Sequence, residues 1–129
     1  MIKKNFLVIN FIGKNDCLAI KFKNKFFVKK FQNKINNSDN LVNNILNFLK
    51  KKGINLDKNF SVLVNLGPGS YTSLRVSIAV AKGIQIAKET KLFGFKNEQI
   101  SEFNLENIEL LIKSKSLENK LIKPFYTLN

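Results

Sequence analysis

Hydrophobic positions in the first 31 residues predict three consecutive strands. Residues 6–9 form a continuous apolar run, which is typical of a central strand buried on both faces. After a polar turn at residues 10–15, apolar residues alternate with lysines up to residue 23, which is the period of a half-buried strand. An aromatic, β-prone run follows at residues 26–31. The short connections between these runs predict hairpin-like neighbours.

The next segment has the period of a helix. Leu41, Ile45 and Leu49 recur every four residues, and Ser38 precedes them as a candidate N-cap. Three consecutive lysines and then Gly53 end the pattern with positive charges and a residue suited to a left-handed cap. We therefore predict a helix over residues 38–52.

Residues 60–95 read as strand, glycine loop, long helix and strand. The run at 60–65 is apolar and short, the helical pattern covers 71–88, and 92–95 is again β-prone. The helix is apolar around most of its circumference. Arg75 and Lys82 share a narrow polar stripe, and Leu74 and Ile78 point another way. One face is therefore expected to cover the sheet, and another to meet a partner helix.

Weaker signals follow in the last third of the chain. We predict a short helix at residues 98–107, a strand at 108–113 and another strand at 121–128. The two strands would form one hairpin. The sequence shows no repeat of fixed period and no low-complexity linker.

The loop Gly67-Pro68-Gly69-Ser70-Tyr71-Thr72 lies between the buried strand and the long helix. At such a position, backbone N–H groups and the helix dipole hold anions. No Gly-Lys-Ser/Thr follows, so the loop is not a Walker A motif. The alternative is a rigid turn with Ser70 or Thr72 as N-cap. The candidate nucleotide-binding or anion-binding residues are Gly67, Pro68, Gly69, Ser70 and Thr72.

Composition narrows the possible chemistry. A chain of 129 residues with 44% hydrophobic content fits one compact domain. No apolar run approaches the roughly 20 residues that span a bilayer, and we expect neither a signal peptide nor a membrane association but a cytoplasmic protein. The single cysteine excludes an internal disulfide. The absence of histidine excludes Ser-His-Asp chemistry and the commonest transition-metal ligand.

The net charge of +13 raises the question of nucleic-acid binding. Lys, Asn, Ile and Phe make up about half the chain and share A/T-rich codons, so the lysine excess also fits base composition acting on solvated surfaces. The charge is nevertheless uneven. Residues 1–60 carry 13 lysines against 3 acidic residues, whereas residues 98–129 carry 4 against 5. Any anion-binding surface is therefore expected in the first half.

The nine residues from Gly67 to Arg75, followed by Ala-Val-Ala-Lys-Gly at 79–83, closely resemble a family signature. It is G-P-G-S-F/Y-T-G-L-R with its following A-K-G helix, found in the TsaB (YeaZ) family. The order of elements over residues 6–94 also matches. The resemblance implies an α/β, ribonuclease-H-like or actin-like (ASKHA) lobe with a mixed five-stranded sheet over residues 1–97. Residues 98–129 would be a remnant of a truncated second lobe or a C-terminal extension.

This resemblance implies a non-catalytic scaffold in threonylcarbamoylation of the tRNA adenosine next to the anticodon. The implied partner is a TsaD-like catalytic subunit. The further contacts considered are a TsaE-like ATPase, a second copy of the chain in a homodimer, and an indirect or weak contact with tRNA. In the family the first-lobe helices make the contact. Arg75 is expected to bind a carboxylate or loop carbonyls with its planar fork. The expected interface residues are Leu41, Ile45, Leu49, Leu74, Arg75, Ile78 and Lys82.

The sequence also departs from the family pattern. Where the family's first strand runs I-D-T-S, this chain has Ile9-Asn10-Phe11-Ile12, and Ser73 stands where glycine is usual. Asparagine lacks the charge that holds a hydrated metal, so we expect no bound cofactor or metal. The alternatives are a degenerate, stand-alone nucleotide-binding or ATPase lobe, and a small basic RNA-binding protein. A single arginine and the lack of an aromatic stacking platform count against the latter.

Overall fold

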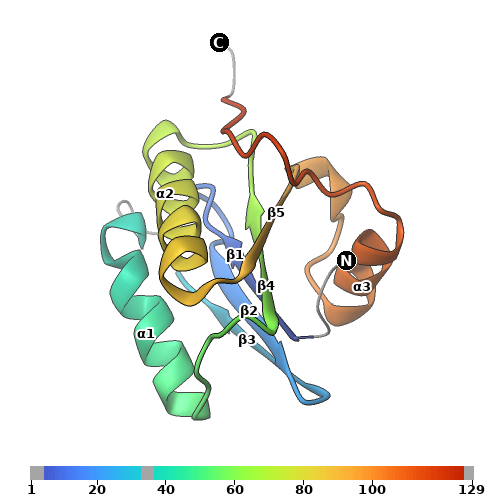
Figure 1. Ribbon diagram of the computed structural model, residues 1–129. Helices are drawn as coiled ribbons and strands as arrows, with labels where there is room; N and C mark the ends of the chain where they lie inside the picture. The colour runs from blue at the N-terminus through green and yellow to red at the C-terminus, as the bar shows by residue number, and fades with distance from the viewer. Residues whose placement is uncertain (1–4, 33–36, 127–129) are drawn as a thin grey trace.

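The computed structural model describes residues 5–32 and 37–126, with the backbone alone for residues 37 and 38. Its centre is a mixed five-stranded sheet with the strand order β3-β2-β1-β4-β5 (Figure 1). β1 pairs antiparallel with β2 and parallel with β4, and β4 pairs parallel with β5. All five predicted strands of residues 6–95 are confirmed: β1 (Asn5–Asn10), β2 (Cys17–Phe22), β3 (Lys25–Lys30), β4 (Phe60–Asn65) and β5 (Lys91–Phe95).

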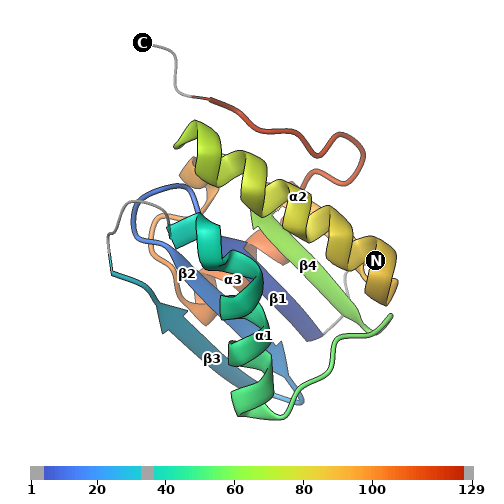
Figure 2. The same cartoon turned by 90° about the vertical axis from the view of Figure 1, so that its left-hand side faces the viewer.

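Helices cover both faces of the sheet. The helices α1 (Leu41–Lys52) and α2 (Tyr71–Lys88) lie on one face, and α3 (Leu105–Lys113) lies on the other (Figures 1 and 2). Successive strand side chains point to opposite faces, so Leu7 packs beneath α1 and α2 while Phe6 packs with α3. In the part of the chain that the structure describes, no helix is long and apolar enough to cross a membrane.

The ends of α1 differ in how well the sequence predicts them. The α-helix begins at Leu41, after a 3₁₀ turn over Asn37–Asn40, and Asn40 is the N-cap residue. The side chain of Ser38, the predicted cap, lies outside the described residues. At the other end Gly53 has φ +66°, and its amide donates to the Lys50 carbonyl at 3.1 Å. The predicted glycine cap is therefore confirmed.

The prediction of a hairpin after residue 97 is wrong. Residues 108–113 belong to α3, where Ile108 and Leu111 are buried against the sheet three positions apart, as a helix requires. The Asn104 side chain caps this helix by accepting from the Asn107 amide at 2.8 Å. Of the predicted helix at 98–107, only the 3₁₀ turn Asn97–Gln99 and the start of α3 are helical. Residues 121–126, the described part of the last predicted strand, contain no strand.

After α3 the chain returns along the sheet as a tail over residues 114–126. Glu118 and Gly94 of β5 exchange two backbone hydrogen bonds, of 2.7 and 2.9 Å. Further on, the Phe125 amide donates to the Leu66 carbonyl at 2.7 Å. The tail therefore partly covers the β5 edge of the sheet, while β3 forms the opposite edge.

Candidate functional site

The glycine loop packs tightly against the turn between β1 and β2. The Ser70 amide donates to the Ile12 carbonyl at 2.8 Å. A Cβ at Gly69 would lie 2.7 Å from both the Cβ and the carbonyl oxygen of Ile12, and a Cβ at Gly13 would lie 2.7 Å from the Cβ of Ser70. Gly67 has φ +102°, a conformation that favours glycine. The glycines of the loop therefore permit close contact between two backbone segments.

Hydrogen bonds within the protein occupy several of the loop's donors. The Gly67 amide donates to Asn65 Oδ1 at 2.8 Å, and the Ser73 amide donates to Ser70 Oγ at 3.3 Å. Ser70 is thus the N-cap of α2, as the rigid-turn alternative predicts. Pro68 and Thr72 are exposed. Because the amides of residues 67, 70 and 73 already have partners, an anion could recruit only the remaining donors.

A shallow pocket of about 700 Å³ adjoins the loop. Lys14 is the cation in its described lining, and Tyr71 and Tyr126 stand beside each other with ring centroids 4.8 Å apart. Its described lining contains no carboxylate: Ile12, Gly13, Lys14, Pro68, Gly69, Ser70, Tyr71, Asn97 and Tyr126. The pocket therefore offers one positive charge and aromatic surface.

Asn10 at the end of β1 belongs to a neutral polar cluster. Its Oδ1 accepts from Asn65 Nδ2 at 2.7 Å, and its Nδ2 lies 3.3 Å from the Asn15 carbonyl and 3.6 Å from Cys17 Sγ. Burial raises the pKa of the Cys17 thiol to about 11, so this thiol is neutral and unreactive near pH 7. The amide of Asn10 therefore links β1 to β4 and, through Cys17, to β2.

Asp16 secures the turn that the glycine loop packs against. Its Oδ1 accepts from the amides of Ile12 and Gly13, at 3.1 and 3.0 Å. The carboxylate is almost fully buried, and two backbone donors compensate for the water that it has lost. Among the residues that the structure describes, no three His, Cys, Asp or Glu side chains lie close enough together to hold a metal ion.

The expected interface residues differ in their exposure. Five of them are mostly buried beneath α1 and α2: Leu41, Ile45, Leu49, Leu74 and Ile78. Of these, Ile45 and Leu49 also line the groove between the two helices. Lys82 is exposed. Arg75 is exposed too, but its partner is Tyr71: Nη1 donates to the hydroxyl at 2.6 Å, and the guanidinium lies 5.1 Å from the ring centroid. Arg75 is therefore held by an aromatic ring and its hydroxyl instead of the predicted carboxylate or loop carbonyl.

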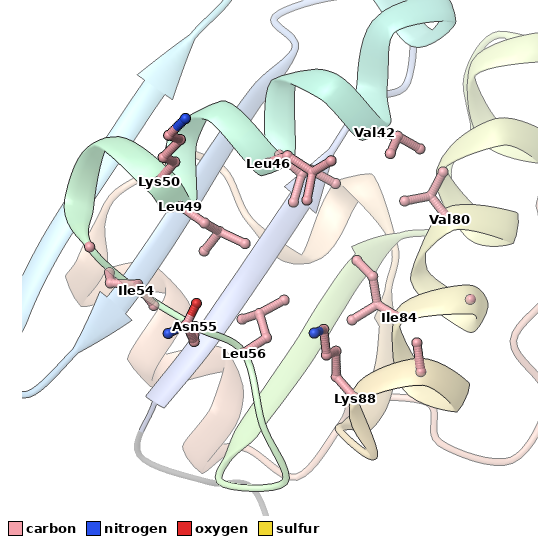
Figure 3. A pocket seen from close by; sticks show the side chains of 14 residues that line it. Val42, Leu46, Leu49, Lys50, Ile54, Asn55, Leu56, Val80, Ile84 and Lys88 are labelled. Carbon is pink, nitrogen blue, oxygen red and sulfur yellow. The ribbon is translucent and has the colours of Figure 1, made fainter.

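Exposed apolar surface lies in a groove between α1 and α2, and on α1 it is one position after the predicted residues. The groove has a volume of about 730 Å³. Figure 3 shows Val42 and Leu46 of α1 opposite Val80 and Ile84 of α2, with Leu56 between the helices. The side chains of Val42 and Leu46 are 53% and 58% exposed. Their spacing of four residues was visible in the sequence, but it does not show which side of the apolar stripe faces the sheet.

Lysines stand at one end of this groove. Lys50 comes from the last turn of α1 and Lys88 from the last turn of α2 (Figure 3). No acidic residue is found in its described lining, whose other polar or small members are Gly53, Asn55, Gly83 and Ala87. The groove is therefore apolar along its length and positive at one end.

Comparison with known proteins agrees with the fold and with the glycine-loop signature. YeaZ from Pseudomonas aeruginosa superimposes with a TM-score of 0.65 at 16% identity, covering 74% of this chain and 44% of that one. A second structure from the same organism, described as an uncharacterized protein with similarity to peptidase YEAZ, gives 0.63 at 16% identity and the same coverage. The similarity confirms the predicted ribonuclease-H-like, actin-like α/β fold. The chain spans less than half the length of these structures.

Sequence comparison gives the family. No curated protein matches the chain significantly. The family model for TsaD, described as tRNA N6-adenosine threonylcarbamoyltransferase, matches residues 33–99. This region contains α1, β4, the glycine loop, α2 and β5, and it makes up more than half of the sequence. The resemblance carried by residues 67–83 is confirmed, and the chain belongs to the TsaD family.

Proposed function

We propose that the chain is a non-catalytic subunit in the threonylcarbamoylation of the tRNA adenosine next to the anticodon. It acts by docking on a TsaD-type catalytic subunit, which performs the transfer. The observation that carries this proposal is the open apolar groove between α1 and α2. Family membership indicates the reaction. The groove offers a docking surface, through which the chain would take part in that reaction without a catalytic centre of its own.

The groove fits an amphipathic helix. Two walls of aliphatic side chains, which diverge from the end near Val42 and Val80 and have Leu56 between them, form the kind of surface that receives one apolar helix face. Val42 and Leu46 are each more than half exposed in the isolated chain. Burying an exposed leucine side chain completely contributes about 1.5–3 kcal/mol, so the rim of the groove alone favours docking by a few kcal/mol.

Charge favours a different protein over a second copy of the chain as the occupant. A two-fold symmetric dimer through this face would place the same lysine-bearing helices on both sides of the contact. Lys50 and Lys88 would then face a surface of the same sign without an acidic residue of α1 or α2 to balance them. An occupant with acidic residues near the Lys50 and Lys88 end satisfies the groove better.

Several properties of the chain support a non-catalytic role. The sequence contains no histidine, and the polar residue at the end of β1 is the neutral Asn10, whose amide already bonds to Asn65. The glycine loop uses the amides of residues 67, 70 and 73 within the fold. These residues give the chain little with which to hold a metal-bound triphosphate.

The test is a matched pair of substitutions on opposite faces. Leu46→Asp places a carboxylate in the groove, and Leu110→Asp makes the same change on α3, where the leucine is 57% exposed against 58% for Leu46. Calorimetric titration with a TsaD-type subunit should show at least a tenfold loss of affinity for Leu46→Asp, because docking must desolvate a carboxylate where the parent offers an apolar side chain. Leu110→Asp should stay within about twofold of the parent.

Both variants should fold as the parent does, since both leucines are largely exposed, and circular dichroism melts check this. Equal affinities for the two variants would show that the groove is not the docking surface. A parent chain that fails to bind the catalytic subunit would contradict the proposed function itself.

A further inference from the structure

Charge is divided unequally between the two ends of the sheet. β2, β3, the turn between them and α1 contain eight lysines and no acidic residue: Lys21, Lys23, Lys25, Lys29, Lys30, Lys50, Lys51 and Lys52. Residues 91–126, which include β5, α3 and the tail, contain six lysines and five glutamates. A lysine excess due to base composition alone would be spread over both ends. The concentration around β3 and α1 therefore needs its own explanation.

Three of these lysines lie on one continuous surface. Alternation along β3 places Lys25, Phe27 and Lys29 on the same face of the sheet, and Phe27 packs into the cluster beneath α1. Lys52, in the last turn of α1, holds its Nζ 4.4 Å from the Phe27 ring centroid. Figure 2 shows α1 running in front of β2 and β3. Lys25 and Lys29 thus flank the contact between α1 and β3, about 13 Å apart along the strand.

Lys21 and Lys30 belong to the opposite face. Lys21 Nζ pairs with Glu109 of α3 at 2.8 Å, and Lys30 lines a polar pocket with Ser101 and Glu102. The surface formed by Lys25, Lys29 and Lys52 has no such acidic neighbour in β2, β3 or α1. Its positive charge is therefore available to an external anion.

We propose that Lys25, Lys29 and Lys52 form a surface that contacts the phosphate backbone of tRNA, an inference that rests on the proposed function. Lysine amines bind phosphates as point charges and release counterions from the nucleic acid, which gives affinity without base readout. Bidentate guanine recognition belongs mainly to arginine, and the one arginine of the chain is bound to Tyr71 on α2. The surface holds any tRNA near the complex, and the catalytic subunit selects the substrate.

The experiment compares two triple variants of equal net charge. One is Lys25→Gln/Lys29→Gln/Lys52→Gln, and the control is Lys113→Gln/Lys120→Gln/Lys123→Gln, whose lysines lie on α3 and the tail. Fluorescence anisotropy measures the binding of each chain to a labelled tRNA transcript between 50 and 200 mM salt. The first variant should bind at least tenfold more weakly at the lowest salt. The slope of log affinity against log salt concentration should be shallower by about 2–3, at roughly 0.7–0.9 for each of the three lost phosphate contacts. The control should stay within about twofold of the parent.

Three outcomes would overturn the inference. Equal weakening of the two variants would mean that tRNA responds to net charge alone. Unchanged tRNA affinity with new self-association of the first variant would mean that Lys25 and Lys29 only protect an edge strand from pairing. Tighter lysine-dependent binding of the parent to phosphatidylglycerol vesicles than to tRNA would identify a membrane surface.

Titration of both variants with the TsaD-type subunit separates this inference from the proposed function. The groove lies outside the substituted positions, so both variants should bind the catalytic subunit as the parent does. Retained subunit binding with no difference between the variants in tRNA affinity would reject the phosphate surface and leave the proposed function intact. Failure of the parent to bind the subunit would reject the proposed function, while the tRNA titration would still report on the lysines.

Discussion

The glycine loop and the groove between α1 and α2 both involve α2. The loop is packed and hydrogen-bonded within the chain, whereas the groove leaves apolar side chains exposed. In the loop, amides find acceptors within the protein, and there is no room for a Cβ at Gly69. In the groove, Val42 and Leu46 are more than half exposed, and a Cβ at Gly83 would meet nothing within 4 Å. The most recognisable stretch of sequence therefore supports the architecture, and an unremarkable stretch provides the open surface.

The same substitution in the two regions should have opposite effects. Gly69→Ala forces its Cβ to within 2.7 Å of the Ile12 backbone and should lower the free energy of unfolding by about 2 kcal/mol or more. Gly83→Ala replaces an exposed helical glycine with free space around it and should raise that free energy by about 0.5–1 kcal/mol. Urea denaturation measures both. A Gly69→Ala chain as stable as the parent would show that the loop yields readily and that the comparison overstates its rigidity.

Alkaline pH should weaken the polar cluster near the loop, which includes the Cys17 thiol. The folded chain raises the pKa of the Cys17 thiol from 9.0 to about 11, mainly by burial. The unfolded chain therefore releases the proton first, and the stabilisation is complete below pH 9 and lost as the pH rises towards 11. The stability of the parent relative to Cys17→Ala should fall by about 2 kcal/mol over this interval.

Denaturation of parent and Cys17→Ala at matched pH values isolates this effect, because every other residue is the same in both chains. A difference in stability that stays constant from pH 8 to pH 11 would contradict the raised pKa.

The smallest expected effect on stability concerns Arg75, which contacts Tyr71 one turn earlier on α2. The guanidinium bonds to the Tyr71 hydroxyl and stacks near its ring, but both residues are exposed. Arg75→Lys should therefore lower the free energy of unfolding by no more than about 0.5 kcal/mol. Tyr71→Phe provides the control, since it removes the hydrogen bond and keeps the ring. A loss above about 1 kcal/mol for Arg75→Lys would reveal a contact beyond Tyr71.

The sequence predicts the sheet and the first two helices well because each carries a local signal. The run at β4 is apolar throughout, α1 ends on three lysines and Gly53, and α2 begins at a serine that caps it. α3 was misread as a strand because a short run such as residues 108–113 suits either structure. The decisive signal was Asn104, a good N-cap three positions before Asn107, whose amide it binds.

The site was harder to predict than the fold, for a geometrical reason. Periodicity identifies an apolar stripe on α1 but not the part of it that the sheet buries. Ile45 is 2% exposed and its neighbour Leu46 is 58% exposed, although both are aliphatic. Which of them is open to a partner depends on the separation of α1 and α2 on the sheet, and no local sequence pattern predicts that separation.

The two edge strands of the sheet, β3 and β5, are protected in different ways, and this difference affects how a shortened chain would behave. β3 ends the sheet with Lys25, Lys29 and Lys30, whose charges discourage a neighbouring molecule from adding a strand. β5 carries Lys91 at its first position and then only Leu, Phe and Gly, and it relies on the tail through the paired hydrogen bonds of Glu118 and Gly94. A version cut after α3 would expose an apolar ribbon with free backbone donors and acceptors. Such a fragment would tend to assemble into aggregates through β5, even though every strand and helix of the fold would still be present.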